Sequence, residues 1–371
     1  MIFQRIKVTW INRENASSNL PKIKDLRGGW INGKFDVRMA GGCNLFGYDN
    51  FVWDKLKLEN KFMFSTAQNS DSVYKQLASK LEFRSLTDVY YSGTSGSDSI
   101  ECAIRAAYTL TDKRKIVTRQ GTWHGSTIVS SLCGNHEFFD GQDLINTEEN
   151  IIKPIEYFDD YKLLDELVKS DIEFLKTQKD VGIFLIEPLP CNSTGLSYVF
   201  NDSGVYNDLR KYCDENEIIL IFDEIQLGFK TGKKYFTEHL DIDPDFLCIS
   251  KCVTSGVIPF SVVISKESYL KKLKHGHTWS GHYLGAVAAN HTIDYFYDCL
   301  ENLNLLVKEF GSHFDNVLGS LWSISQNKGK QSERILNVSW GAAHNKMLYM
   351  IPPNTPKKHL EFIIKETLRD S

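Results

Sequence analysis

Six short runs of apolar residues, each bounded by turn-forming residues, recur along the middle of the chain. They lie at 89–93, 115–119, 182–188, 218–224, 245–250 and 259–265. Runs of this length without polar alternation are typical of parallel β-strands that are buried on both faces. The pattern therefore predicts a buried and mostly parallel central sheet.

Helical periodicity fills several of the intervals between these runs. The clearest pattern begins at Asp98 and continues to about Thr111, with apolar residues spaced as on one face of a helix. Further helices are predicted at 71–81, 160–178, 204–215 and 283–300. Strands that alternate with helices predict an α/β domain with helices on both faces of the sheet.

The two ends of the chain follow a different pattern. Residues 1–60 are rich in Gly, Asn and Trp and show weak periodicity. Residues 301–371 predict a helix, one or two short strands, and a closing helix near 356–369. We expect the N-terminal segment and the C-terminal region to form a smaller α+β domain that packs against a large α/β domain at 61–300.

Composition and charge narrow the class of protein. The chain has 371 residues, of which 42% are hydrophobic and 24% charged, as in ordinary soluble proteins. A formal net charge of −4 gives no electrostatic reason to expect nucleic acid or anionic membrane as a partner. The apolar runs are too short to span a bilayer, and the first residues do not predict a secretory signal.

The cysteines bear on the cellular compartment. All eight are scattered, without a CxxC pair. This spacing is typical of reduced thiols, so we expect a cytoplasmic protein. We predict no metal site.

The start of the helix after the first strand is a candidate phosphate site. Ser95-Gly96-Ser97 precedes Asp98, and a helix N-terminus offers free backbone N–H groups to a phosphate. A simple N-cap would have the same sequence. The stretch lacks GxGxxG, and GFKTGKK at 228–234 fails the Walker pattern, so a nucleotide is not the expected ligand.

Two ionisable residues follow neighbouring strands. Asp223 ends the run at 218–224, and Lys251 comes directly after the run at 245–250. Each has an ordinary alternative, a capping carboxylate or a surface lysine. Together with the phosphate site and with Trp123 as an aromatic plate, they match the needs of pyridoxal phosphate: a Schiff-base lysine, a carboxylate against the pyridine nitrogen, and a stacking ring.

Six blocks in order resemble the class III aminotransferases, the fold-type I pyridoxal-phosphate enzymes that include the ω-aminotransferases. The blocks are SGSDSIECAIR, TWHG, IEP, LIFDEIQLGF, KCVTSGVIPFSVV and HTWSGH, between about residues 90 and 300. The family places a glutamate five residues after the phosphate-site glycine. Glu101 stands at that distance from Gly96, which favours Ser95-Gly96-Ser97 over Ser92-Gly93-Thr94.

The resemblance implies a role for each matching residue. Lys251 would form the Schiff base and carry the proton between substrate and cofactor, and Glu187 would lie near both. The cofactor-binding residues that it implies are Ser95, Gly96, Ser97, Trp123, His124, Asp223, Gln226, Lys251 and Thr278. Among them Asp223 would pair with the pyridine nitrogen, Gln226 would bind the phenolic oxygen, and Thr278 would reach the phosphate of a neighbouring subunit, which implies a homodimer.

Some positions depart from the family pattern. Many members carry an arginine before the C-terminal Pro-Pro that binds a substrate carboxylate, but LYMIPP at 348–353 has none. Cys252 replaces the usual glycine after the lysine, and Tyr283 replaces a proline. The missing arginine and the TSG form of the loop after Lys251 favour a primary amine, an ω-amino group or an amino group on a specialised metabolite as the donor.

The predicted function is an aminotransferase that moves an amino group from a primary amine or amino acid donor to a keto acid or aldehyde acceptor through pyridoxamine phosphate. A pyridoxal-phosphate-dependent aminomutase, lyase or racemase is the alternative on the same scaffold. A non-catalytic binding protein is the third possibility, although such a protein would not need Lys251, Asp223 and Gln226 together.

Overall fold

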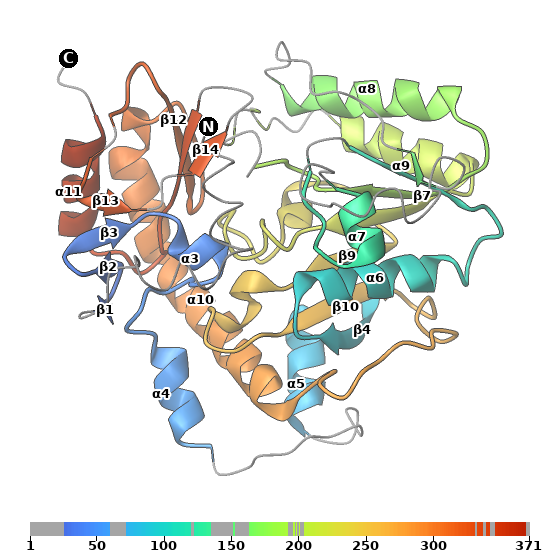
Figure 1. Cartoon of the computed structure of the whole chain (residues 1–371), viewed down its shortest axis with the longest axis horizontal. Coiled ribbons are helices and arrows are strands. Elements are labelled where there is room, and N and C mark those ends of the chain that lie inside the picture. Colours follow the sequence, from blue (N-terminus) through green and yellow to red (C-terminus); the bar gives the residue numbers. More distant parts are fainter. Residues whose placement is uncertain are drawn as a thin grey trace, which may run out of the picture.

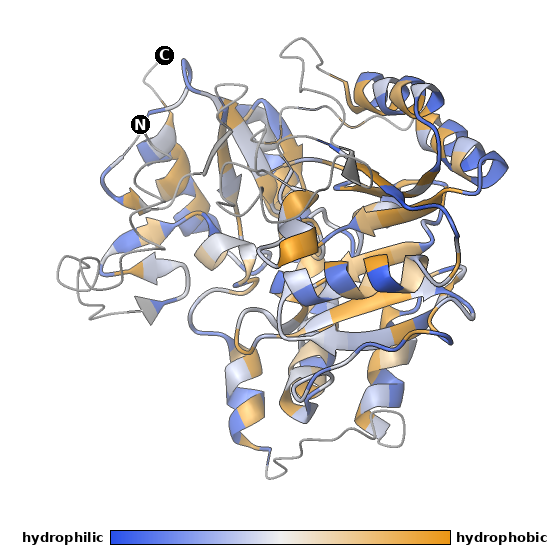
Figure 2. Ribbon diagram, turned by 45° about the vertical axis from the view of Figure 1, so that its right-hand side comes forward, coloured by the Kyte–Doolittle hydropathy of each residue, from blue (hydrophilic) through white to orange (hydrophobic). Residues whose placement is uncertain are grey.

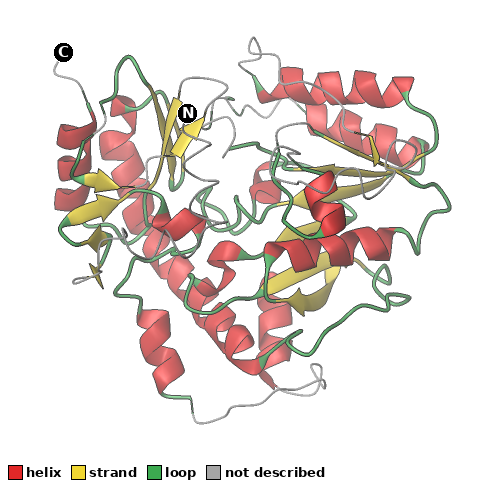
Figure 3. Cartoon of the chain, in the orientation of Figure 1, coloured by secondary structure: helices red, strands yellow, loops and turns green. Residues whose placement is uncertain are grey.

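The computed structural model shows a large sheet flanked by helices beside a smaller region that holds both ends of the described chain (Figures 1 and 3). It describes residues 26–59, 72–119, 122–134, 151–152, 163–191, 196, 198, 200, 204–330, 332–336, 339–341 and 346–368. Within these residues, no helix is both long enough and apolar enough to cross a membrane.

The central sheet has seven strands in the order β4-β10-β9-β8-β7-β5-β6. Their bounds are β4 Leu86–Gly93, β5 Lys115–Thr118, β6 Ile151–Ile152, β7 Val181–Ile186, β8 Ile219–Asp223, β9 Phe246–Ile249 and β10 Ser261–Lys266. Strands β6, β5, β7, β8 and β9 are parallel to one another. The six predicted strands are therefore present, and β6 is an additional short one.

One predicted strand has the opposite direction. The run at 259–265 forms most of β10, which pairs antiparallel with both β9 and β4. Only the 3-10 turn η4 (Lys251–Thr254) and a few further residues connect β9 to β10. A parallel return needs a crossover of a dozen residues or more, so this short connection forces the antiparallel arrangement.

The two faces of the sheet are covered by different helices. Alternate residues of β7 show the division: Ile183 packs in the core beneath α6, whereas Phe184 packs in the core shared with α8, α9 and α10. Figure 2 shows the central strands as largely hydrophobic and the covering helices as mixed. The helices of this region are α5 Ser72–Leu81, α6 Gly96–Ala107, α7 Ile128–Leu132, α8 Leu164–Thr177, α9 Val205–Glu215 and α10 Tyr283–Phe310, with the 3-10 turn η3 at Phe236–His239.

Helix α10 is longer than predicted. The pattern predicts its end near residue 300, but buried side chains continue through Leu303, Leu306 and Phe310. The extra turns reach the smaller region, where Leu306 and Phe310 join its core. One helix thus connects the central sheet to the C-terminal region (Figure 1).

The C-terminal region holds five strands, so the prediction of one or two is wrong. A four-stranded sheet has the order β11-β12-β15-β14, and β3 pairs in parallel with β13 in another sheet of order β1-β2-β3-β13. The bounds are β1 Leu26–Arg27, β2 Trp30–Ile31, β3 Lys34–Asp36, α3 Met39–Gly42, α4 Phe51–Lys57, η5 Gly311–His313, β11 Asn316–Leu318, β12 Leu321–Ser325, β13 Ile335–Leu336, β14 Ser339–Gly341, β15 Lys346–Met350 and α11 Lys357–Thr367. The β3–β13 pair joins the two ends of the described chain, whereas the proposed domain boundaries stay a prediction.

Candidate functional site

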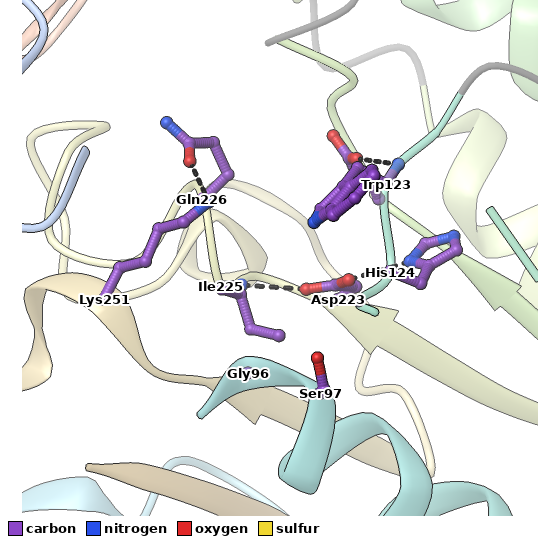
Figure 4. A pocket seen from close by; sticks show the side chains of 10 residues that line it. Gly96, Ser97, Trp123, His124, Asp223, Ile225, Gln226 and Lys251 are labelled. Carbon is purple, nitrogen blue, oxygen red and sulfur yellow. Dashed lines mark hydrogen bonds and ion pairs between the residues drawn. The ribbon is translucent and has the colours of Figure 1, made fainter. Parts of the chain in front are cut away.

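A cavity lies at the carboxyl edge of the central sheet, where ligands of open α/β sheets collect (Figure 4). The ends of β4, β5, β7, β8 and β9 all contribute to it. Its lining residues are Gly96, Ser97, Trp123, His124, Gly125, Glu187, Asp223, Ile225, Gln226 and Lys251. Eight of the predicted site residues are therefore brought together, although they are spread over more than 150 positions of the chain.

The N-terminus of α6 forms the floor of this cavity. The helix begins at Gly96, and Ser95 is its N-cap, with a side chain that accepts from Asp98 N. The Asp98 carboxylate in turn accepts from the N–H groups of Thr94 and Ser95, both at 2.9 Å. The first-turn N–H groups that point along the helix axis have no carbonyl partner within the helix, so they can bind an anion.

Gly96 is required by close packing. A Cβ at this position would lie 2.7 Å from Cδ1 of Ile225, so any larger residue would displace Ile225 from the cavity wall. The Ser97 hydroxyl accepts from Ser126 N at 3.0 Å, which joins the α6 terminus to the segment after Trp123. Glu101, five residues after Gly96, accepts from Thr127 Oγ1, Val129 N and Ser130 N and so caps α7.

Asp223 is held by two donors. His124 Nδ1 lies 2.8 Å from its Oδ2, and Ile225 N donates to its Oδ1 at 3.0 Å. The other ring nitrogen of His124 lies within hydrogen-bond distance of the hydroxyls of Thr118 and Thr122. His124 therefore fixes the orientation of the carboxylate, and both side chains are buried.

Glu187 carries a buried oxygen without a partner. Its Oε1 accepts from Trp123 N at 3.2 Å, whereas Oε2 has no hydrogen-bond partner among the described residues. Burial, and next the charge of Asp223, raise the pKa of this carboxyl group. An unsatisfied polar atom in a cavity wall is costly unless a ligand contacts it.

Lys251 follows β9, and its side chain enters the cavity from the side opposite Trp123 and His124 (Figure 4). Its Nζ donates to Oε1 of Gln226, and its backbone has a φ of +24°. Such a conformation is rare outside glycine and is found at functional sites. Burial is the main cause that lowers the pKa of Lys251, which shifts the amine toward its uncharged, nucleophilic form.

Trp123 and Ile225 form two walls of the cavity. Figure 4 shows them on opposite sides of the Asp223 carboxylate. Trp123 is 44% exposed, which is unusual for a tryptophan that only fills a core. A flat ring between an indole face and an aliphatic side chain would have both faces covered.

Two lining residues were not predicted. Ile225 stands in the sequence between Asp223 and Gln226, so its place between two predicted site residues could have indicated that it lines the cavity. Gly125 has a φ of +137°, and a Cβ there would lie 2.5 Å from the hydroxyl oxygens of Ser97 and Ser130. Gly125 is the glycine of the TWHG block, but only the fold shows that it makes room for Ser97.

Two predicted residues lie outside the cavity lining. Ser95 acts as the α6 N-cap, and Thr278 lies exposed in the loop between β10 and α10. This loop packs beside the start of α6, since His277 Nε2 lies 3.8 Å from Asp98 Oδ2. The role of Thr278 toward a neighbouring subunit stays a prediction.

The strand before Pro352 brings a thioether toward the cavity. Met350 ends β15 and is fully buried, and its Sδ lies 3.6 Å from Nε2 of Gln226. Lys251 is the one lysine or arginine among the described residues that line the cavity. The residue before Ile351 and Pro352 is therefore an apolar side chain in contact with the cavity residue Gln226.

The residues present fit pyridoxal phosphate. A helix N-terminus can hold the phosphate, Asp223 can face a protonated ring nitrogen, and Lys251 supplies an amine that burial keeps reactive. Glu187 Oε2 and the exposed face of Trp123 are left for a bound ring.

Comparison with known proteins agrees with this geometry. A family model described as "Aminotransferase class-III" matches residues 56–331. The adenosylmethionine-8-amino-7-oxononanoate aminotransferase of Staphylococcus aureus is 29% identical over 314 residues, which cover 75% of this chain and 66% of that protein. The corresponding enzyme of Methanocaldococcus jannaschii is 26% identical over 72% of this chain and 67% of its own length. The chain thus spans about two thirds of these curated relatives.

Solved structures show the same fold. A taurine:2-oxoglutarate aminotransferase from Bifidobacterium kashiwanohense, in complex with PLP and glutamate, has a TM-score of 0.76 and 21% identity over 94% of this chain and 91% of its own. The structure of the M. jannaschii enzyme also has a TM-score of 0.76, with 19% identity over 98% and 97% of the two chains. The predicted fold class is confirmed.

Proposed function

Because this chain belongs to the class III aminotransferases, a family of pyridoxal-phosphate-dependent enzymes, we propose that it transfers an amino group from a primary amine or amino acid to a keto acid or aldehyde. The resemblance deduced from the six sequence blocks is thereby confirmed at the level of the family. The observation that carries the proposal is the placement of Lys251 and Asp223 in one cavity beside the α6 N-terminus.

Each group of the cavity has a task toward the cofactor. The N–H groups of Gly96 and Ser97 would hold the phosphate, Trp123 would stack on the ring, and Asp223 would pair with the ring nitrogen. Gln226 would bind the phenolic oxygen. Bound in this way, pyridoxal phosphate supplies an electron sink for the bond that breaks beside the amino group.

Lys251 moves the proton. Burial lowers the pKa of this amine, which favours the uncharged form that accepts a proton from the substrate carbon and delivers it elsewhere in the cavity. His124 keeps Asp223 oriented through the 2.8 Å contact, and Glu187 lies on the same side as Trp123. The remaining Glu187 oxygen is available to the substrate or to the cofactor.

The described cavity lining favours a donor without an α-carboxylate, because Lys251 is its one lysine or arginine. Met350 and Ile351 are buried before Pro352, where an arginine would bind such a carboxylate. A primary amine or an ω-amino group does not need that cationic partner. Donor and acceptor stay open within this class.

The assembly and location follow the same reasoning. The exposed position of Thr278, beside the start of α6, supports a homodimer in which this residue reaches the neighbouring phosphate. The eight free cysteines support a cytoplasmic location. The near-neutral charge supports neither nucleic acid nor membrane as a partner.

An absorption experiment tests the proposal. We expect the protein reconstituted with pyridoxal phosphate to show a visible band that Lys251→Ala abolishes and that the exposed-site control Lys271→Ala retains. Excess amine without acceptor should bleach the band, and a keto acid should restore it. A band that persists while product accumulates from one substrate would indicate a mutase, lyase or racemase instead, and a band unaffected by Lys251→Ala would refute the assignment.

A further inference from the structure

A second lysine is buried next to the catalytic lysine. Lys230 lies in the segment GFKTGKK, which failed the Walker pattern and has no role in the proposed function. Its side chain is fully buried, and its Nζ donates to the backbone carbonyl of Gln226 at 2.5 Å. No ion pair between Lys230 and a carboxylate is found in the part of the chain that the structure describes.

Both lysines bind the same glutamine. Lys230 binds the backbone carbonyl of Gln226, and Lys251 binds its side-chain carbonyl. Lys230 also contacts the thiol of Cys252, the residue that follows Lys251. Gln226 is confined further by Met350 Sδ and by Gly42, where a Cβ would lie 2.7 Å from its Nε2.

The charges around Lys251 are few and mixed. The titratable groups that act on it are Lys230, Cys43, Asp223 and Glu187, from the loop after β8, the end of α3, β8 and the end of β7. Asp223 is already bound to His124 and to Ile225 N. After burial, Lys230 is the largest influence on the pKa of Lys251, and it lowers that pKa.

We propose that Lys230 is a positioning residue for Lys251: its charge disfavours a second charge on the Lys251 amine, and its hydrogen bond fixes Gln226 so that the side-chain carbonyl faces that amine. Adjacent cationic groups activate a lysine in this way because two like charges in a buried site repel each other. The inference rests on the proposed function of Lys251 as the cofactor lysine.

The basicity of Lys251 can be measured without the reaction. In protein freed of cofactor, acetic anhydride acetylates only uncharged amines, and mass spectrometry of the Lys251 peptide gives the pH of half-maximal labelling. For Lys230→Met we expect this midpoint to rise, with Lys251 labelled about tenfold more slowly at pH 8 for each unit of the shift in pKa. Lys230→Arg should keep the wild-type midpoint, because it retains the charge.

Lys234→Met is the matched control. Lys234 is also a buried lysine whose Nζ donates to a backbone carbonyl, that of Lys80 at 2.6 Å, but it has no contact with Gln226. This variant should leave the Lys251 midpoint unchanged. An unchanged midpoint in Lys230→Met, or an equal shift in Lys234→Met, would overturn the proposal.

A measurement on the unmodified protein covers the case in which Lys230→Met does not fold. Lys251 should be labelled at lower pH than Lys234, which has glutamates rather than a cation as its charged neighbours. The reverse order would overturn the proposal. If the labelling midpoint shifts as expected but Lys251 forms no visible band with pyridoxal phosphate, the proposed function fails and the coupling of the two lysines stands. If the visible band forms but the labelling midpoint does not shift, only the coupling is refuted.

Discussion

The two edges of the central sheet treat buried charge in opposite ways. At the amino edge, Asp245 precedes β9 and accepts from Arg210 at 2.9 Å, from Lys266 at 2.8 Å and from Leu220 N at 2.8 Å. At the carboxyl edge, two groups lack an ionic partner among the described residues: one oxygen of Glu187 has no hydrogen-bond partner, and the Lys251 amine donates to the amide oxygen of Gln226.

The difference separates structural charge from functional charge. A buried carboxylate with two cations and a backbone donor is satisfied by the protein itself, so it can only stabilise or destabilise the fold. A carboxyl oxygen without a hydrogen bond and an amine without an ion pair destabilise the empty protein and gain partners when a ligand enters. Changes at the carboxyl edge should therefore alter chemistry, and changes at the amino edge should alter stability.

Lys251→Ala should produce the largest effect. In the proposed function this amine is both the point of covalent attachment and the proton carrier, so we expect its loss to reduce transamination by at least about 10⁴-fold, or about 5 kcal/mol in the barrier. The free energy of unfolding of the variant should equal or exceed that of the wild type, because a buried amine is lost. Steady-state kinetics and urea unfolding test both parts; a large loss of stability would contradict the comparison.

Asp245→Ala should produce the reverse outcome. Removal of this carboxylate leaves Arg210 and Lys266 without their shared partner, and we expect a cost of about 3–5 kcal/mol in the free energy of unfolding. The turnover number of the folded fraction should stay close to wild type. Urea unfolding followed by circular dichroism measures the first quantity, and a folded variant with strongly reduced turnover would show that the amino edge also serves the chemistry.

Glu224→Gln tests whether a carboxyl group takes part in the chemistry because of its position at the carboxyl edge alone. Glu224 lies beside Asp223, but its carboxyl group accepts from Phe236 N, Thr237 N and Thr237 Oγ1 and does not line the cavity. The glutamine amide would face one of these donors, at a cost of about 1–3 kcal/mol. We expect unchanged turnover, since this carboxyl group is satisfied by the protein and does not face the cavity.

The pH dependence of stability gives a second test at Glu224. Burial raises the pKa of this group from 4.5 to about 7, so the folded state binds a proton that the unfolded state releases. This contribution is complete below pH 4.5 and is lost as the pH rises toward 7. Thermal melts between pH 4.5 and 8 should show less loss of stability in Glu224→Gln; parallel curves for both proteins would exclude the raised pKa.

Glu187→Gln should have the smallest effect on stability. Burial and the Asp223 charge raise the pKa of Glu187. In cofactor-free protein, the stability that this group contributes is therefore lost as the pH rises above the pKa of the group in the unfolded state. We expect the substitution to flatten that loss and to change the Michaelis constant for the amine, because the oxygen without a partner faces the cavity. An effect on stability as large as that of Asp245→Ala would place Glu187 among the structural charges.

Local pattern was sufficient for much of this molecule. Apolar runs and helical periodicity predicted six of the seven strands described in the central sheet and the helices α5, α6, α8, α9 and α10, because each pattern reflects burial of one segment. The short elements β6 and α7 were not predicted. The ends of those runs also predicted Asp223 and Lys251 as site residues, since a parallel sheet brings successive strand ends to one edge.

Tertiary structure decided the rest, because pairing between distant segments leaves no local periodicity. The direction of β10, the β3–β13 pair and the extra turns of α10 depend on connections and on packing partners. The same holds for the contact of His124 with Asp223 and for the two lysines on Gln226. The sequence by itself determined the residues to which we assign the chemistry. The fold decided which of them remain without a partner among the described residues, since a charge is satisfied only by the neighbours that packing brings to it.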